Sequence, residues 1–376
     1  GDHRDLHYPL RRQRQMCIRD RQDGILSLSN RLRNRLLRKG EVEMSVRIKD
    51  VARRAGVSTA TVSRVLNNVS TVSEENRQRV LEVVKEMGYS PNVLARGFRM
   101  KKTFTVGMVL PDLSNPHFPL MMKGAEETLR KNNYNLIIAN SDGKLEFERE
   151  AINTLLSKHV DGILFIGSGY NRAVETLIEE SGCPIVLLGR RWSKTLPSVS
   201  IDNFSAMKHV FDHLYGEGHR SFLYLGGPED VSSSIDREEA ARAVGQEYSS
   251  VAVKITRGQF TYESGYERAF SELSDHGNSY DAVVCANDLI AFGALVSCKA
   301  LSIGVPEELS VTGFDNIFLS AQFTPSLTTL DQNTYEIGSR AAILLLQYIS
   351  GERKNKISFQ LGTSLIVRES SRARGK

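Results

Sequence analysis

The chain has 376 residues, 40% hydrophobic and 25% charged, which is the composition of an ordinary globular protein and enough chain for two or three folding units. No apolar run reaches the roughly 20 residues of a membrane-spanning helix, and the four cysteines have no C-x-x-C spacing, so reduced thiols in the cytoplasm are expected rather than a disulfide framework or a zinc site. The net charge of +5 is unevenly divided, because residues 46–102 hold 12 Lys/Arg against 5 Asp/Glu whereas residues 103–376 hold 26 against 33, as in a polyanion-binding module joined to a sensor.

The first 45 residues do not form a secretory signal, because their Arg- and Gln-rich sequence has no apolar h-region. Leu28, Leu32 and Leu36 have helical spacing among arginines, which allows a frayed basic helix. We expect residues 1–45 to be a disordered or non-native extension, with Met44 as the natural start.

A first helix is predicted where Ile48, Val51, Ala52 and Ala55 fall on one helical face. Gly56 follows, and glycine is the residue best able to take the left-handed turn that ends a helix. The helix and its turn mark the start of a small basic domain.

Two further helices follow in this domain. Ser58 is a good N-cap for a helix over Thr59–Leu66, and Ser73 for a helix over Glu74–Met87. Three short helices with a Gly turn and a basic surface indicate a helix-turn-helix DNA-binding domain over residues 46–90.

A proline then separates this domain from the rest of the chain. Pro91 cannot continue a helix and biases Ser90 towards an extended conformation. Asn92 can cap a very short helix over 93–98, which is followed by cations. A short basic helix between two unlike domains indicates a hinge and linker, residues 91–103, that also contacts an anionic partner.

The stretch RIKDVARRAGVSTATVSRVLN, residues 47–67, resembles the head of the lactose/galactose-repressor family of bacterial transcription regulators. The likeness continues through VSEE at 72–75, GYSPN at 88–92 and the hinge, to about Arg368. Several motifs in order make the resemblance specific. It implies a homodimer that binds a near-palindromic operator in double-stranded DNA, acts in the cytoplasm without a membrane partner, and responds to a small-molecule effector, most simply a sugar. It implies no cofactor and no metal.

The resemblance assigns DNA contacts in the second helix. Thr59 and Ala60 match the residues that point at base edges in the major groove, where the Thr methyl or Ala can meet a thymine methyl. Thr61, Ser63 and Arg64 match base or phosphate contacts, and Asn67 matches a backbone contact. The alternative for Thr61 and Ser63 is that they only cap or solvate the helix. Arg47 departs from the family's Ser/Thr N-cap, so the first helix is expected to start less firmly unless Ser45 substitutes.

The resemblance also gives the hinge a role in DNA binding. Asn92, Leu94, Ala95 and Arg96 match a small helix that, paired with its copy from the second subunit, lies in the minor groove. Phe98 matches the apolar wedge that enters between the central base pairs and kinks the DNA, where the family usually has Leu. The alternative is that Phe98 packs on its own domain.

The region 104–371 alternates strand and helix patterns and is expected to bind the effector and to dimerise. Parallel sheets covered by helices on both faces follow from such alternation. The fold class is therefore α/β, with the three-helix head and hinge helix joined to a bilobal body of two doubly wound lobes like that of periplasmic binding proteins, crossing near Asp202 and Thr328. Strands are expected at 105–110, 134–139, 161–166, 184–189, 221–225, 252–255, 281–286 and 309–314, with helices at 118–131 and 146–158 among others.

Candidate effector contacts follow the strands, because ligands of open α/β sheets sit beyond the carboxyl ends of the strands. An Arg beside Asp and Asn suits bidentate hydrogen bonding to vicinal hydroxyls or a carboxylate, and aromatic rings can cover a sugar face. The alternatives are that Asp112 only caps a helix and that Trp192 is a lid or dimer contact. The residues that these arguments and the resemblance select are Asp112, Asn115, His117, Phe118, Trp192, Arg237, Asn287 and Asp315.

Two other classes of protein, an enzyme and a simple binding protein, fit the sequence less well than a repressor. An enzyme is disfavoured because the body has no G-x-S-x-G, H-E-x-x-H, P-loop or G-x-G-x-x-G motif. A binding protein alone leaves the basic head and hinge unexplained. A regulator governed by a phosphoprotein corepressor, as in the catabolite-control branch, stays as the alternative, since the hinge of that branch resembles the string Ala95-Arg-Gly-Phe.

Overall fold

The computed structural model describes residues 46–66, 71–89, 102–190, 193, 195–276 and 279–373. The chain divides into two compact units, residues 1–96 and 97–376. The expected extension at 1–45 and most of the expected hinge, 91–101, lie outside the described residues.

The head contains three helices, α2 (Ile48–Ala55), α3 (Thr59–Leu66) and α4 (Glu74–Glu86), as the sequence predicts. Apolar side chains from all three, including Val51, Val62 and Val80, form one small buried core. Gly56 adopts the expected left-handed conformation, with φ of 66°, and so allows α3 to turn back against α2.

The helix starts differ in part from the prediction. The Arg47 side chain does not cap α2. The Asp50 carboxylate, in the first turn, instead accepts the Arg47 backbone N–H at 3.0 Å, which is the second hydrogen bond of a capping box. The Ser58 hydroxyl accepts the Thr61 N–H at 3.1 Å, as an N-cap should. The prediction for Ser73 is wrong in its chemistry, because Ser73 occupies the cap position of α4 without a side-chain hydrogen bond. Acidic residues in the first turn favour that helix end instead.

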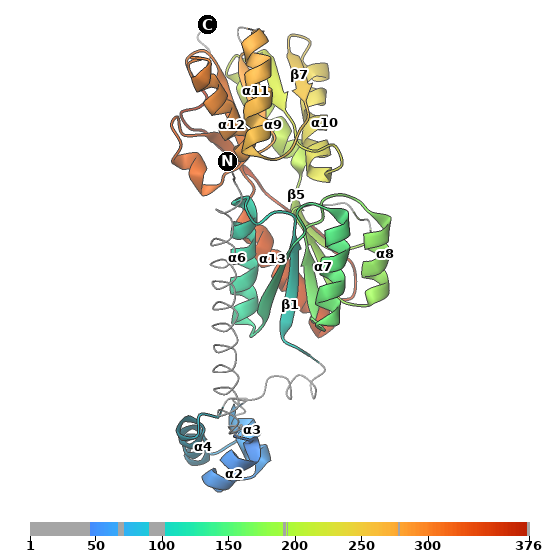
Figure 1. Cartoon of the computed structure of the whole chain (residues 1–376), viewed down its shortest axis with the longest axis vertical. Coiled ribbons are helices and arrows are strands. Elements are labelled where there is room, and N and C mark those ends of the chain that lie inside the picture. The colour runs from blue at the N-terminus through green and yellow to red at the C-terminus, as the bar shows by residue number, and fades with distance from the viewer. Residues whose placement is uncertain are drawn as a thin grey trace, which may run out of the picture. The chain divides into compact units, whose positions relative to one another are not determined.

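The first lobe of the body is built on a six-stranded parallel sheet in the order β11-β5-β4-β3-β1-β2. Figure 1 shows helices α6, α7, α8 and α13 around this sheet. The strands are β1 (Thr105–Leu110), β2 (Asn135–Asn140), β3 (Gly162–Phe165), β4 (Ile185–Leu188), β5 (Ser198–Ile201) and β11 (Ser358–Leu361). The helices are α6 (His117–Lys131), α7 (Leu145–Ser157), α8 (Arg172–Ser181) and α13 (Thr334–Ser350).

The second lobe repeats this design with a sheet in the order β12-β10-β9-β8-β6-β7, in which only β12 is antiparallel. The strands are β6 (Ser221–Leu225), β7 (Ala252–Thr256), β8 (Ala282–Cys285), β9 (Ser310–Asp315), β10 (Thr328–Asp331) and β12 (Ser364–Ile366). The helices are α9 (Asn203–Gly216), α10 (Ser232–Glu247), α11 (Tyr262–His276), α12 (Asp288–Ala300) and the short 3₁₀ helix η2 (Phe318–Ala321). The predicted α/β class with two doubly wound lobes is confirmed.

The chain passes between the lobes three times. It leaves the first lobe at Asp202, whose carboxylate caps α9 by accepting the Ser205 N–H at 3.1 Å. It returns between Asp331 and Thr334, slightly beyond the expected Thr328, because residues 328–331 form β10 of the second sheet. A third passage, between β11 and β12, was not expected from the sequence.

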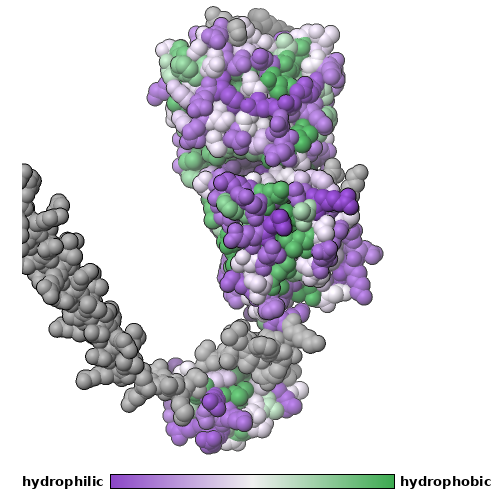
Figure 2. Space-filling view, turned by 45° about the vertical axis from the view of Figure 1, so that its right-hand side comes forward, coloured by the Kyte–Doolittle hydropathy of each residue, from purple (hydrophilic) through white to green (hydrophobic). Residues whose placement is uncertain are grey.

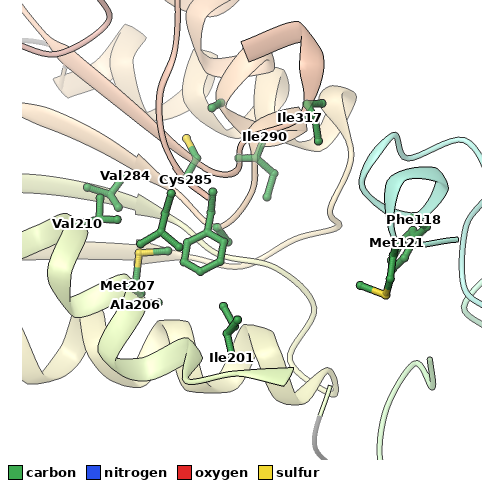
Figure 3. Close-up of a cluster of buried hydrophobic side chains, with 14 of the residues drawn as sticks. Phe118, Met121, Ile201, Ala206, Met207, Val210, Val284, Cys285, Ile290 and Ile317 are labelled. Atoms are coloured by element: carbon green, nitrogen blue, oxygen red, sulfur yellow. The ribbon is translucent and has the colours of Figure 1, made fainter. Parts of the chain in front are cut away.

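The body core lies between each sheet and its helices. Figure 3 shows Met207 and Val210 of α9 close to Val284 and Cys285 of β8, all of them buried. None of the helices described for this chain is long and apolar enough to cross a membrane.

Candidate functional site

One face of α3 is open to solvent and carries the residues predicted to contact DNA. Thr59, Ala60 and Arg64 are exposed, whereas Val62 and Val65 point into the head's core. Ala60 and Arg64 are four residues apart and therefore lie one above the other on the same helix face. The arrangement suits insertion of this face into a DNA major groove.

Two other residues of this helix are only partly exposed. Besides its N–H, Thr61 brings its hydroxyl within 2.9 Å of the Ser58 hydroxyl, so its side chain helps to cap the helix, as the alternative for this residue expects. Ser63 is half-buried on the next turn. The remaining predicted contacts lie outside the described residues: Asn67, Asn92, Leu94, Ala95, Arg96 and Phe98.

Two adjoining cavities lie between the lobes of the body. An inner one has a volume of about 40 Å³ and an outer one about 410 Å³. They share four wall residues, Asn115, Phe118, Arg190 and Phe260. In Figure 2 the two lobes of the body meet at a furrow lined by hydrophilic and apolar surface. The cavities are large enough together for a monosaccharide-sized ligand.

The loop after β1 forms the first-lobe wall. Asp112 lines the outer cavity, but its carboxylate already accepts the Ser114 N–H at 2.8 Å and the Ser114 hydroxyl at 2.6 Å. Asn115 lines both cavities, and its side-chain oxygen accepts the His117 N–H at 3.0 Å. Asp112 therefore stabilises the turn after β1 as well as lining the outer cavity. Phe118 adds an apolar side chain to the walls of both cavities.

His117 is buried in the inner cavity wall. Its Nδ1 lies 3.3 Å from the Thr334 hydroxyl, and its ring packs edge-on against Phe118 with centroids 5.2 Å apart. Burial lowers the pKa of His117 to about 3, with further lowering by the charges of Arg237 and Arg190. The imidazole is therefore neutral at physiological pH and can serve as a hydrogen-bonding partner but not as a cation.

Arg237, on α10, is held rigidly at the second-lobe wall. Its Nε donates to the Asn203 side chain at 2.9 Å and its Nη1 to the Ala286 carbonyl at 2.6 Å. The guanidinium lies 3.7 Å from the centroid of the Phe314 ring. Burial lowers the pKa of Arg237, but an arginine remains protonated at neutral pH.

Asn287 and Asp315 end two neighbouring strands beside Arg237. The Asn287 oxygen caps α12 by accepting the Ile290 N–H at 2.9 Å, and its Nδ2 donates to the Phe260 carbonyl at 3.3 Å. Asp315 accepts a hydrogen bond from Gln332 and lies 3.8 Å from Nδ1 of His117. Burial raises the pKa of Asp315 to about 7, against the lowering effect of Arg237.

The structure thus brings seven of the eight predicted effector residues to the two cavities; Trp192 lies outside the described residues. Sequence reasoning missed other wall residues. Arg190 follows β4 and lies in both cavities, so its position at a strand end was the available signal. Gln332 follows β10, which was not recognised as a strand, and Phe260 lies in a loop with no distinctive pattern.

Donors, acceptors and aromatic rings surround the cavities, which is the chemistry of binding a polar small molecule. Within the described ranges, no group of three His, Cys, Asp or Glu side chains could hold a metal ion. The arrangement is that of a binding site.

Comparison with known proteins identifies the families of the head and of the body. Residues 47–92 match the bacterial regulatory proteins of the lacI family, and residues 211–371 match the periplasmic binding protein-like domain. The chain is 34% identical over 334 residues to the HTH-type transcriptional regulator RegA of Clostridium saccharobutylicum, across 87% of this chain and 100% of RegA. It is 36% identical over 313 residues to catabolite control protein A of Staphylococcus epidermidis, across 82% of this chain and 94% of that protein. A solved complex of the transcriptional regulator CelR with cellobiose superposes with a TM-score of 0.67 at 28% identity, covering 87% of this chain and 100% of CelR.

Proposed function

Because the chain belongs to the lacI family of bacterial regulatory proteins and is a DNA-binding transcriptional regulator, we propose that it is a repressor controlled by a small-molecule effector. The proposed effector is a sugar or sugar derivative bound between the lobes of the body. Its relatives are transcription regulators, not enzymes, and we expect this chain to act in the cytoplasm.

The observation that carries the proposal is the pair of cavities whose walls come from both lobes. Phe118 and Arg190 belong to the first lobe, and Arg237 and Asp315 to the second. A ligand that contacts both walls binds better to one angle between the lobes than to another, and so shifts the equilibrium between these angles. The CelR complex, in which a relative holds cellobiose, supports a carbohydrate as ligand.

The mechanism we propose couples this angle to DNA affinity. In a homodimer, a change in the angle between lobes would change the spacing of the two hinge segments and of the two α3 helices. Operator DNA with a near-palindromic sequence accepts only one spacing, since its half-sites repeat along the double helix at a fixed distance. Effector binding would then alter operator affinity by a coupling free energy, typically 1–3 kcal/mol.

A homodimer also fits the exposed apolar surface of the body. Phe318 of η2 is 64% exposed and Ile343 of α13 is 45% exposed. Burial of such side chains against a second copy would contribute roughly 25 cal/mol for each Å² of apolar area. Light scattering of the full chain at micromolar concentration tests this, and a monomeric mass would contradict it.

Two measurements test the proposed function. Fluorescence anisotropy with near-palindromic DNA from upstream of the chain's own gene should give an affinity that falls steeply between about 50 and 200 mM salt. A thermal-shift panel of sugars and sugar derivatives should then contain a compound that also changes operator affinity. Arg237→Ala should abolish that response, and an intact response would place the effector elsewhere.

The alternative is control by a phosphoprotein corepressor, which the similarity to catabolite control protein A favours. In that case no small molecule of the panel would change operator affinity by itself, and a phosphorylated protein from the same cell would. Adding each class separately to the anisotropy assay distinguishes the two.

A further inference from the structure

Two guanidinium groups from opposite lobes face one cavity, and neither is in direct ion-pair contact with a carboxylate that the structure describes. Arg190 follows β4 in the first lobe, Arg237 lies on α10 in the second, and both line the inner cavity. Arg190 uses Nη1 on the carbonyls of Gly167 and Ser168, at 2.7 and 3.4 Å. Neither arginine forms an ion pair with any carboxylate that the structure describes, and the Nη2 atom of each has no hydrogen-bond partner in those residues.

Such an arrangement is unusual for charges that are largely removed from water, and here Arg237 is buried and Arg190 half-buried. Burial lowers the pKa of Arg190 to about 10 and the charge of Arg237 lowers it further, while the carboxyl groups of Glu148, Asp230 and Asp315 act in the opposite direction. Buried cations are normally paired, because an unpaired charge in a low-dielectric site loses the hydration that water gives it. Two like charges in one cavity add repulsion.

One carboxyl group, Asp315, lies in the same cavity but does not balance the two arginines. It is bonded to Gln332 and lies near the neutral His117, and burial raises its pKa to about 7, so it is only partly ionised at neutral pH. Even fully ionised, it is the one carboxylate among the described residues that line the inner cavity, against two guanidinium groups, whereas Glu148 and Asp230 act on Arg190 from outside that cavity. A ligand with a negative group supplies the missing charge.

The outer cavity has the opposite character. Three carboxylates line it, those of Asp112, Asp142 and Asp230, together with the single guanidinium of Arg190 among its described lining residues. They are suitable acceptors for hydroxyl groups and would repel a ligand that carries negative charge at this end. The inner cavity is the smaller of the two, so it suits one small group of the ligand, and the outer cavity has more room for the rest.

We propose that the effector is a polyhydroxylated monocarboxylate, a sugar acid, whose carboxylate lies between Arg190 and Arg237 and whose hydroxyl-bearing part occupies the outer cavity. The planar guanidinium fork matches a carboxylate in bidentate geometry. A phosphate dianion would be opposed more strongly by the outer carboxylates, and a neutral sugar would leave the arginines without a counterion. Because the two arginines belong to different lobes, the carboxylate replaces repulsion across the cleft with attraction and draws the lobes together. This inference rests on the proposed function, of which it specifies the ligand.

The test uses the full chain and matched ligands. D-glucuronate, D-galacturonate and D-gluconate are compared with D-glucose, D-galactose and the 6-phosphates of both sugars, by calorimetric titration and by thermal shift. At least one acid should bind about 10- to 100-fold tighter than its neutral counterpart, the range expected for charge-assisted hydrogen bonds to buried groups. Arg190→Gln should remove this preference, and Arg190→Lys should restore part of it. Arg149→Gln, which changes an exposed arginine of α7, should leave it intact.

Each result has one interpretation. If no acid binds tighter than its neutral counterpart, or if Arg190→Gln keeps the preference, the proposal is wrong. A preference for the phosphorylated sugars also overturns it. In either case a neutral or phosphorylated sugar that changes operator affinity would leave the proposed function standing, whereas control of operator affinity by a phosphoprotein alone would overturn both.

Discussion

Two buried aspartates illustrate how differently neighbouring carboxyl groups are used. Asp288, at the start of α12, accepts the Ile317 N–H at 2.9 Å and the Ser320 hydroxyl at 2.7 Å, and it is also bonded to the Thr329 hydroxyl. Its acceptors are satisfied within the protein, which makes it a structural residue that holds the segment after β9 against β10. Asp315 has a single hydrogen-bond donor among the described residues, Gln332, and lies on the cavity wall.

This contrast predicts the effect of pH on Asp315→Asn. Burial gives Asp315 a pKa of about 7, well above the usual value of about 3.9 in an unfolded chain. Between these values the folded protein keeps a proton that the unfolded chain has released, so the free energy of unfolding falls as pH rises from about 4 to 7 and then levels off. Asp315→Asn should remove up to about 1.4 kcal/mol per pH unit from that slope. Urea denaturation at several pH values between about 5 and 8 measures it.

Asp288→Asn is the matched control, since burial also raises the pKa of Asp288 to about 7. That variant leaves hydrogen-bond donors without an acceptor, so its free energy of unfolding should be lower by about 1–3 kcal/mol even at high pH, where wild-type Asp288 is ionised. Effector affinity should change for Asp315→Asn, which alters the cavity wall, and not for Asp288→Asn. Parallel stability curves for wild type and Asp315→Asn would contradict the first prediction.

How far the site could be predicted from sequence depends on the strand ends. Asn287 follows the apolar strand β8 and Asp315 ends β9, two strands that the sequence predicts, so their positions were readable from the pattern, and the family resemblance selected Arg237. Gln332 was missed because the strand before it is rich in threonine. Arg190 also follows a predicted strand, but a single sequence does not reveal that it shares a cavity with a second arginine from the other lobe.

At the scale of elements, the strands predicted from sequence are those with aliphatic runs. The missed ones are short and polar: SVSI in β5, TTLD in β10, SFQL in β11 and SLI in β12. Ser198, Ser200, Thr328 and Thr329 are nonetheless buried, because they lie where the chain passes between the lobes and neighbouring segments cover them. Strand formation there depends on pairing with distant strands, which a local pattern does not contain.

Two helix pairs show the same close packing, one in each lobe. A Cβ atom on Gly124 of α6 would overlap the Tyr335 carbonyl oxygen, and one on Gly338 of α13 would overlap that of Met121. In the second lobe, Gly265 and Gly293 let α11 and α12 approach in the same way. These glycines are therefore required by backbone contact between helices, not by a special conformation.

Gly338→Ala should consequently destabilise the first lobe. The added methyl group would push α13 away from α6, at a cost of about 1–3 kcal/mol in the free energy of unfolding. Gly216→Ala is the control, because Gly216 ends α9 with no atom within 4 Å of the added Cβ. Thermal denaturation of both variants measures the difference, and equal melting temperatures would show that the helices can separate without cost.

At the scale of the molecule, the head and hinge sequence carries an excess of positive charge and the body an excess of negative charge. Part of the positive charge lies on the exposed face of α3. Arg64 is exposed on that face and has no carboxylate partner among the described residues. Arg54, on α2, is 61% exposed and pairs with Glu86 of α4 at 2.8 Å. Both arginines are exposed, but only Arg54 has a carboxylate partner among the described residues.

Arg64→Gln should therefore weaken operator binding, while Arg54→Gln should not. If Arg64 contacts a phosphate, its removal lowers affinity for all sequences and reduces the salt slope by about one. Anisotropy over a range of salt concentrations measures affinity and slope together. Effector affinity in the absence of DNA should be unchanged for both variants, and a similar loss of operator binding in both would mean that only net charge matters.

The last prediction concerns the coupling between the two functions of the chain. If effector and operator bind to different states of one molecule, linkage requires that each change the affinity of the other by the same factor. The factor by which saturating effector changes the Kd for operator should equal the factor by which saturating operator changes the Kd for effector. Anisotropy gives the first and calorimetric titration the second. Arg237→Ala should abolish effector binding, because it removes a guanidinium group from the cavity wall. Operator binding should stay near that of the effector-free wild type, because the DNA-binding face of α3 is unchanged. Unequal factors in the wild type would mean that the two ligands are not linked through a single equilibrium.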